Sequence, residues 1–327
     1  MLRTLSVFLV FLASPGLAAC GGTDLMARMP AAELAALRDR ARQSPHAEGL
    51  LWQARNGDRV VHLVGTMHLY DPRHQAMLDR VQPLLEAADT VFLELGAGDE
   101  ARLQAMIAEQ PDLAFITEGP TLPDLLDAAD WDRLRAALSE RGVPGLLAAK
   151  MKPWMAMANL AITRCDFANL KSGKRGLDAL VIDRAVALGK PPRALEPIET
   201  AFGIFGGFTQ DEQIEMLRLA LAQQAQDSAD QAVTVTEAYF REEVQLIWEW
   251  SMHQAFNYPG FSAEAIQGQI DTLQTVLLDR RNTAWIEEIT ATPGTVLVAV
   301  GAMHLPGERG LLALLQARGY TVTRLSL

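Results

Sequence analysis

The alternation of apolar and polar residues predicts β-strands near both ends of the chain. Leu50–Ala54 and Arg59–Val64 are apolar runs that flank an Asn56-Gly57-Asp58 turn, which is typical of a β-hairpin. Thr90–Leu95 is a short run rich in β-branched residues, so we expect a buried strand there. Further strands are predicted at Arg193–Leu195, Thr295–Val300 and Tyr320–Leu325.

The residues between these strands follow a helical pattern. Helices are predicted at Ala31–Ser44, Arg73–Ala88, Gly176–Leu188 and Glu308–Arg318, and mostly helical stretches at 97–170, 209–258 and 262–290. The sequence therefore predicts an α/β fold. We expect one domain over 21–327, with a mixed sheet formed by N- and C-terminal strands and helical insertions at about 97–170 and 209–290.

The first twenty residues have the pattern of a secretory signal peptide: a basic start, a compact apolar run and then small residues. Leu17-Ala18-Ala19-Cys20 also resembles a bacterial lipobox, which predicts a lipid anchor at Cys20. The alternative is a disulfide between Cys20 and Cys165, which are the two cysteines of the chain. Either alternative places the protein outside the cytoplasm, in the periplasm or cell envelope, and lipidation would make it an outer-membrane lipoprotein.

Charge and hydropathy argue against a nucleic-acid partner and against a membrane span. The 327 residues carry a formal net charge of −11, so the phosphate backbone of a nucleic acid would be repelled. After the signal peptide, no apolar segment approaches the length of about 18 residues that a membrane span requires, so we expect no transmembrane segment in the mature chain.

A repeated turn is the most informative motif. Val60–Val64 continues into Gly65-Thr66-Met67-His68-Leu69, and Val296–Val300 continues into Gly301-Ala302-Met303-His304-Leu305. Each copy places a histidine after the carboxyl end of an apolar strand, which is the edge where α/β sheets bind ligands. We therefore expect His68 and His304 to converge on one divalent metal ion, manganese, cobalt or zinc.

A metal site of this kind also needs an anionic ligand. Glu94 ends the buried strand at Thr90–Leu95, where a carboxylate is costly unless it is paired or bound to a cation. With Glu94 the set becomes two histidines and one carboxylate, which leaves coordination positions open as in a catalytic site. The alternative is a salt bridge between Glu94 and an arginine.

Four more residues are candidates for catalysis: Glu196, Glu199, Arg281 and Asn282. Glu196 or Glu199 follows a short strand and could act as general base or as a further ligand. The alternative for Glu199 is a place in the first turn of the next helix. Arg281 lies on the apolar stripe of its helix. Either its aliphatic part packs there while the guanidinium reaches solvent, or the guanidinium faces buried anions or a developing oxyanion. Asn282 could hydrogen-bond to the same group.

Taken in order, several short motifs resemble the TraB/GumN family, which includes the TIKI proteases and the PrgY-type pheromone regulators. They are Leu63–His68, Val91–Glu94, Lys152-Pro153-Trp154, Gly176-Leu177-Asp178, Gly189–Glu199, Arg281–Trp285 and Val300–Leu305. The resemblance covers about residues 50–327 and implies a metal-dependent, peptidase-like site at His68, Glu94 and His304. Met303 departs from the pattern, since bacterial members often have glycine there.

Two hypotheses of function follow. The first is metal-assisted hydrolysis of a peptide bond in a peptide or protein substrate. The second is a non-catalytic envelope protein that binds a peptide, a signalling ligand or a haem-like cofactor in the same pocket, with Met67 and Met303 beside the histidines. A serine hydrolase is disfavoured because the chain has no Gly-x-Ser-x-Gly motif.

Overall fold

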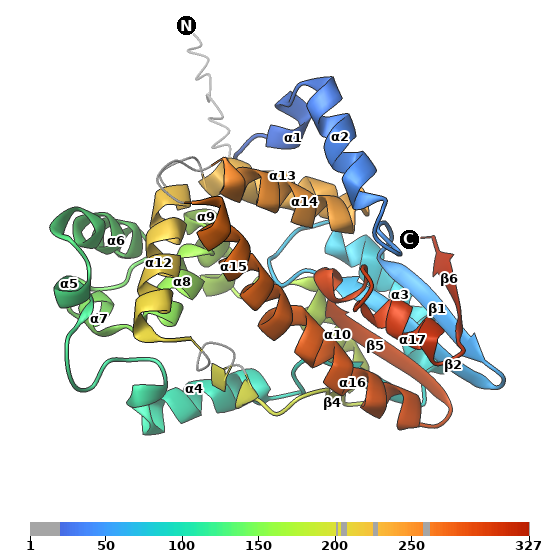
Figure 1. Ribbon diagram of the computed structural model, residues 1–327. Helices are drawn as coiled ribbons and strands as arrows, with labels where there is room; N and C mark the ends of the chain where they lie inside the picture. The colour runs from blue at the N-terminus through green and yellow to red at the C-terminus, as the bar shows by residue number, and fades with distance from the viewer. Residues whose placement is uncertain (1–19, 201, 204–207, 225–227, 258–261, 327) are drawn as a thin grey trace, which may run out of the picture.

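A mixed sheet lies at the centre of the computed structural model (Figure 1), which describes residues 20–200, 202–203, 208–224, 228–257 and 262–326. Its strands in these ranges are β1 (Leu51–Asn56), β2 (Arg59–Thr66), β3 (Thr90–Leu93), β4 (Arg193–Ala194), β5 (Thr295–Gly301) and β6 (Thr321–Leu325). Their order is β4-β3-β5-β2-β1-β6. β4, β3, β5 and β2 run parallel to one another. β1 is antiparallel to both β2 and β6. The predicted α/β fold, with a sheet built from both ends of the chain, is confirmed.

Helices fill the segments between the strands. The α-helices are α1 (Leu25–Arg28), α2 (Ala31–Ala41), α3 (His74–Ala87), α4 (Asp99–Glu109), α5 (Leu122–Leu125), α6 (Ala128–Glu140), α7 (Gly145–Lys150), α8 (Pro153–Leu160), α9 (Arg164–Lys171), α10 (Leu177–Ala187), α12 (Gln210–Gln224), α13 (Ser228–Phe240), α14 (Val244–Phe256), α15 (Ala263–Gln274), α16 (Arg280–Ala291) and α17 (Leu311–Ala317). Short 3₁₀ turns lie at Pro111–Leu113 and Ala302–His304, and a π-helical turn at Thr275–Asp279 joins α15 to α16.

The two faces of the sheet bury different helices because successive side chains of a strand point in opposite directions. Along β5, Leu297 and Ala299 face a core shared with α3 and α10. Val296, Val298 and Val300 face a second core formed with α16 and α17. The sheet is thus the middle layer of three, and β5, which is buried on both sides, lies between β3 and β2.

The helical segments have cores of their own, away from the sheet (Figure 1). Leucines of α5, α6, α8 and α12 form one of them, including Leu122, Leu134, Leu160 and Leu217. Another joins α1 and α2 to α13 and α14 around Trp250. The stretch predicted as helical at 209–258 is divided between α13 and α14 at Glu242, whose backbone φ of 60° is incompatible with a continuous helix.

A disulfide between Cys20 and Cys165 ties the start of the described chain to α9. Of the two alternatives for Cys20, the structure therefore contains the disulfide. A lipid anchor would need the same sulfur atom, so the two states exclude each other. The predicted signal peptide lies, apart from Cys20, outside the described residues. Within the described ranges, no helix combines the length and the apolar character needed to cross a bilayer.

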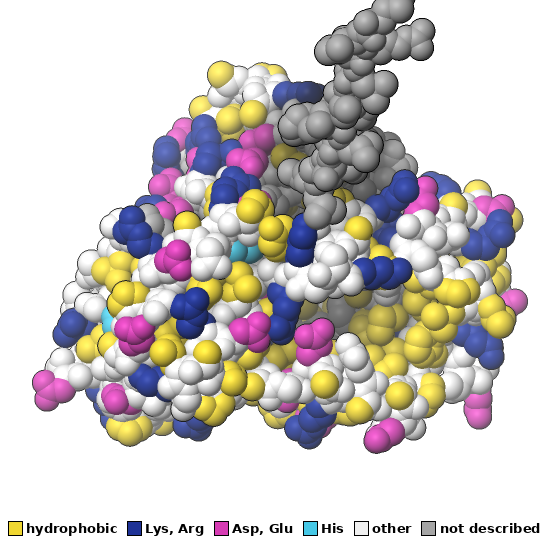
Figure 2. Space-filling view, turned by 180° about the vertical axis from the view of Figure 1, so that it is seen from behind, with side chains coloured by type: hydrophobic (Ala, Val, Ile, Leu, Met, Phe, Trp, Pro, Cys, Tyr) yellow, Lys and Arg dark blue, Asp and Glu magenta, His cyan; other side chains and the backbone are white. Residues whose placement is uncertain are grey.

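The face of the molecule opposite to that of Figure 1 has a mixed surface (Figure 2). Acidic and basic side chains alternate over it, and apolar atoms gather on the right of the view. The helical region contributes exposed apolar side chains, of which Leu146 of α7 is 80% exposed.

Candidate functional site

Four neighbouring strands end at one edge of the sheet, and each is followed by a candidate residue. Glu196, Glu94, His304 and His68 come after β4, β3, β5 and β2, in the order of these strands across the sheet. β3 and β4 end together, because Leu93 pairs with Ala194, and β2 and β5 end together, because Thr66 pairs with Gly301. Leu93 pairs with Ala299, so the second pair of strands extends two residues beyond the first. The parallel part of the sheet therefore gathers residues from distant parts of the sequence at its carboxyl edge, where α/β proteins bind ligands.

Gly301 marks the point where three of these side chains meet. A Cβ atom on Gly301 would lie 3.2 Å from Oε1 of Glu94, 3.7 Å from Cδ2 of His304 and 3.9 Å from Nε2 of His68. The backbone N–H of Gly301 donates to Oε1 of Glu94 at 2.7 Å. The glycine of the second Gly-x-Met-His turn thus leaves open the space that the three predicted metal ligands surround.

The first histidine is held by the start of α10. Nδ1 of His68 lies 3.2 Å from Oδ2 of Asp178, and Leu177 N–H donates to the Met67 carbonyl at 3.0 Å. Gly176 makes this approach possible, since a Cβ there would lie 2.2 Å from the carbonyl oxygen of His68. The hydrogen bond with Asp178 raises the pKa of His68 to about 9, although its side chain is 64% exposed.

The second histidine is buried and is held by α16. Nδ1 of His304 lies 2.7 Å from Oδ1 of Asn282, whose Nδ2 donates to the Arg309 carbonyl at 2.9 Å. The ring of Trp285 lies 4.5 Å from that of His304, centroid to centroid. Burial lowers the pKa of His304 to about 4, so this imidazole is neutral at pH 7. Its Nε2 faces Glu94, with 3.8 Å to Oε1.

Arg281 joins the two glutamates of the edge. Its Nη2 donates to Oε2 of Glu94 at 2.7 Å and to Oε1 of Glu196 at 2.6 Å, and its Nη1 lies 3.3 Å from Nε2 of His304. Trp285 adds an indole N–H to Oε2 of Glu196 at 3.2 Å. The alternative predicted for Glu94, a salt bridge to an arginine, is therefore present in the structure. Glu94 also lies near both histidines, around Gly301.

Glu94 stays ionised in this setting. Burial alone would raise its pKa, but the neighbouring His304, Arg281 and His68 side chains and the Gly301 N–H together outweigh burial and lower the pKa of Glu94. The pKa of Arg281 is raised, because the two carboxylates outweigh its own desolvation. The site thus holds a carboxylate and a guanidinium with little solvent between them.

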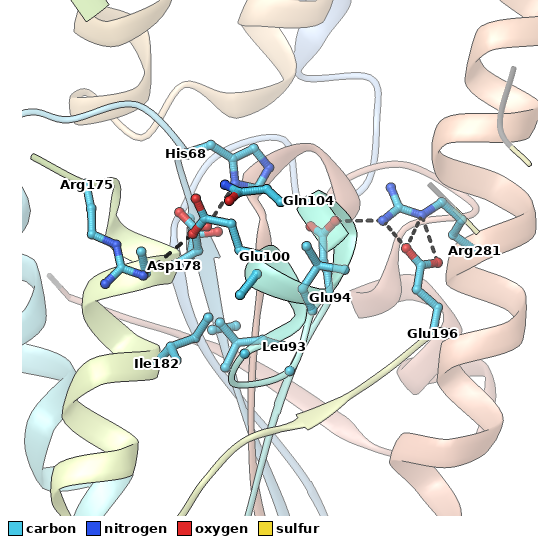
Figure 3. Close-up of a pocket in the computed structure, with 17 residues that line it drawn as sticks. His68, Leu93, Glu94, Glu100, Gln104, Arg175, Asp178, Ile182, Glu196 and Arg281 are labelled. Atoms are coloured by element: carbon cyan, nitrogen blue, oxygen red, sulfur yellow. Dashed lines mark hydrogen bonds and ion pairs between the residues drawn. The ribbon is translucent and has the colours of Figure 1, made fainter. Parts of the chain in front are cut away.

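A pocket of about 590 Å³ opens onto these groups (Figure 3). His68, Glu94, Asp178, Glu196 and Arg281 all line it. Two further polar atoms in its wall, Oγ1 of Thr66 and Oδ1 of Asp178, are buried and have no hydrogen-bond partner among the described residues. Such atoms are costly to bury unpaired.

The structure separates the other predicted catalytic residues. Glu196 lies in the pocket wall, whereas Glu199 is outside it, 53% exposed and 3.3 Å from Arg102. Asn282 is buried behind His304 and does not line the pocket, so it contacts the histidine instead of the group facing Arg281. Of the four residues predicted for catalysis, Glu196 and Arg281 line the pocket, and Glu199 and Asn282 do not.

Two further residues of the site, Asp178 and Trp285, belong to the motifs that resemble the family but were not predicted as site residues. Asp178 orients His68, and Trp285 contacts His304, Arg281 and Glu196. The signal for Asp178 was an acidic residue in the first helical turn directly after Gly176, which usually indicates only a favourable helix start. Trp285 lies one turn after Arg281 on the apolar stripe, where it looked like an ordinary core residue.

The donor atoms fit a divalent metal ion in their chemistry. Two imidazoles, each held at Nδ1 by an oxygen acceptor, present Nε2 beside a carboxylate, the arrangement by which proteins orient metal-binding histidines. Among the described residues, however, no three His, Cys, Asp or Glu side chains are grouped closely enough to hold an ion as they stand. Arg281 contacts two of the three donors. Met67 and Met303 pack against the hydrophobic core.

Comparison with known proteins gives two findings. The model of the TraB/PrgY/gumN family matches residues 50–324. The chain is 25% identical to YbaP of Escherichia coli (strain K12) over 263 aligned residues. The alignment covers 80% of this chain and 89% of YbaP. YbaP of Shigella flexneri matches over the same 263 residues, also at 25% identity and with the same 80% and 89% coverage. The matched segment includes each candidate residue from His68 to His304.

Proposed function

Because this chain belongs to the TraB/PrgY/gumN family, we propose that it is a divalent-metal-dependent hydrolase with a peptide or protein substrate. The observation that carries the proposal is the convergence at Gly301. Nε2 of His68, the ring of His304 and Oε1 of Glu94 surround this glycine, although the two histidines come from opposite ends of the chain. In this proposal these three residues hold the ion, which is manganese, cobalt or zinc.

A bound ion would supply Lewis-acid chemistry at the sheet edge. The chain itself orients the groups around it. Asp178 and Asn282 hold the two Nδ1 atoms. Nε2 of His304 then faces Glu94, and Nε2 of His68 lies near Gly301. Arg281 is a cation at the pocket wall and would face the negative charge that develops on a substrate oxygen.

Glu196 positions Arg281 in this proposal. Both of its oxygens are engaged, Oε1 by Arg281 and Oε2 by Arg281 and the Trp285 indole N–H. Glu199 has no part in the proposal, because it lies outside the pocket.

The cellular location of the protein is the next part of the proposed function. We infer export to the periplasm or cell envelope, with residues before Cys20 acting as the signal peptide. The Cys20–Cys165 disulfide supports this inference, because disulfides persist in oxidising compartments and are rare in the cytosol. The same disulfide disfavours a lipid anchor at Cys20.

A second candidate function is binding without turnover. The observation that favours it is Arg281, which pairs with Glu94 and Glu196 and balances their charge without an ion. In that case the pocket would hold a peptide or another organic ligand. The core packing of Met67 and Met303 gives no support to haem ligation.

Metal content separates the two functions. The purified mature protein is incubated with manganese, cobalt or zinc, desalted and measured by mass spectrometry beside His68→Ala and His304→Ala. His253→Ala is the matched control, because His253 on α14 pairs with Glu33 and does not line the pocket. We expect about one ion per chain in the wild type and the control, and a loss in both site variants. An equal metal content in all four proteins would exclude this metal site.

Cleavage is then tested on the metal-loaded protein with a library of short peptides read by mass spectrometry. We expect products with the wild type and the His253→Ala control, and none with either site variant. Retained metal without any cleavage would favour the binding function.

A further inference from the structure

The pocket beside the proposed metal site has one apolar side. Leu93 and Ile182 lie together on the side away from the Arg281–Glu196 pair (Figure 3), and Ile182 packs against the core cluster that contains Leu93. Ala101, Ala179 and Ala299 also line the pocket and add small apolar side chains. We call these five residues the apolar wall.

The volume suits a ligand much larger than an ion. At about 590 Å³, the pocket falls within the range of roughly 300–1,000 Å³ that is usual for small-molecule sites. A water molecule takes about 30 Å³ of liquid, so the pocket has room for several residues of an extended peptide.

The charges around the pocket disfavour an acidic side chain. Glu94, Asp178 and Glu196 line the interior, and Arg281 is already paired with the two glutamates. Arg175 at the rim lies 2.8 Å from Asp183 and 4.0 Å from Glu100. A basic side chain would have to leave water against Leu93 and Ile182, where the desolvation of its charge is costly.

The helix over the pocket gives access to this wall. α4 follows Gly98, whose φ of 89° lies in the left-handed region, and none of the helix's own residues is buried. Glu100 and Gln104 of α4 stand in front of the pocket (Figure 3), and Ala101 faces it from the same helix. A substitution at Ala101 can therefore change the apolar wall without disturbing a core.

We propose that the apolar wall is the specificity subsite of the enzyme and selects an uncharged aliphatic side chain, such as that of leucine, next to the peptide bond at His68 and Glu94. This inference rests on the proposed peptidase function, because it assumes that the occupant is a peptide. It adds the substrate class: peptides with an aliphatic residue at the cleavage position.

The subsite is tested by binding, so that the result does not depend on turnover. Four peptides, N-acetyl-Ala-X-Ala-amide with X as Leu, Ser, Asp or Lys, are titrated into the full mature protein in EDTA and followed by NMR. We expect the leucine peptide to bind about tenfold more tightly than the other three, as is typical of a pocket that buries several methylene groups. Four equal dissociation constants, or no binding of any peptide, would overturn the inference.

Two tryptophan variants on α4 make a matched pair. Ala101→Trp fills the subsite and should remove the preference for leucine, whereas Ala105→Trp, on the same exposed helix but outside the pocket lining, should keep it. Ile182→Ala enlarges the subsite and should favour X as Phe over Leu. Identical behaviour of the two tryptophan variants would also overturn the inference.

Cleavage of the same peptides with added manganese distinguishes the two proposals. A leucine preference in binding without cleavage would support the subsite and contradict the peptidase function. Cleavage of all four peptides at equal rates retains the function and removes the subsite.

Discussion

Asp178 and His68 form a pair in which Oδ2 of the carboxylate lies 3.2 Å from Nδ1 of the imidazole. The two residues belong to different elements, and the pair exists because α10 begins directly against the turn after β2. Its effect on protonation gives a first prediction, because a metal ion and a proton compete for the same imidazole.

In the wild type, the Asp178 hydrogen bond raises the pKa of His68 to about 9, so His68 carries a proton at pH 7. Metal binding must displace this proton, and we expect the affinity for manganese to rise with pH until about pH 9. In Asp178→Asn the rise should end near the ordinary value of 6.5. Metal titrations at several pH values, with Asp183→Asn on the same helix as control, check this. A wild-type affinity that is independent of pH from 6 to 9 would contradict it.

A second prediction concerns Asn282, which is 1% exposed and bonded to His304 and the Arg309 carbonyl. Asn282→Ala leaves buried polar atoms unpaired, so we expect the free energy of unfolding to fall by about 1–3 kcal/mol. Metal affinity should fall by about 10–100-fold, because the support of a ligand histidine is lost. Urea unfolding and metal titration measure the two effects. Thr283→Ala, exposed on the same helix, should change neither.

Gly176 gives a third prediction. A Cβ here would lie 2.2 Å from the carbonyl oxygen of His68 and 2.4 Å from that of Met67, so Gly176→Ala must displace the turn or α10. We expect a loss of about 1–3 kcal/mol in the free energy of unfolding, as for overpacked sites. Gly268→Ala is the control: its Cβ meets nothing within 4 Å on α15, so a gain of about 0.5–1 kcal/mol is expected. Equal effects of the two changes would show that the close approach is unimportant.

A fourth prediction concerns the buried His74 and the dependence of the free energy of unfolding on pH. Burial lowers the pKa of His74 to about 4 from an ordinary value of 6.5. Above pH 6.5 the residue is neutral in both states. Between pH 6.5 and about 4 the unfolded chain binds a proton that the folded chain does not, so stability is lost as the pH falls. His74→Phe should weaken this loss in urea unfolding at pH 7.5 and 5. An unchanged pH dependence would assign the loss to other groups.

The disulfide gives a fifth prediction. The mature protein should contain Cys20 and Cys165 as a disulfide, which intact-mass measurement before and after reduction detects. Removing it in Cys165→Ser should lower the free energy of unfolding by about 2–4 kcal/mol, because the crosslink closes a long loop. A mass that corresponds to a diacylglyceryl group on Cys20 would contradict the disulfide.

The general fold and the centre of the site could be predicted from local patterns. Val296–Val300 has the apolar run of a buried strand, and the two Gly-x-Met-His turns indicate that His68 and His304 end neighbouring strands. Glu94 follows in the same way, because a carboxylate at the end of a buried strand needs a partner. In each case the information lies within a few consecutive residues.

The remaining parts of the site depend on contacts across the fold. The sequence left open whether Glu196 or Glu199 takes part in the site. In the structure Glu196 pairs with Arg281 and lines the pocket, whereas Glu199 pairs with Arg102 outside it. Asp178 serves His68 through an approach that involves the Gly176 backbone, which no helical or strand pattern encodes. The π-helical turn at Thr275–Asp279 shifts the register before Arg281, and the sequence showed only a long helical stretch there.

The position of β5 has a consequence for the order of assembly. It is among the last strands in the sequence, yet it lies between β3 and β2 and supplies the Gly301 N–H that binds Glu94. A chain that is still being synthesised can form the hairpin of β1 and β2, but β3 has no partner on that side until residue 295 is available. His304 follows later still. A nascent or C-terminally truncated chain therefore has no complete candidate site until its last few dozen residues have joined the sheet.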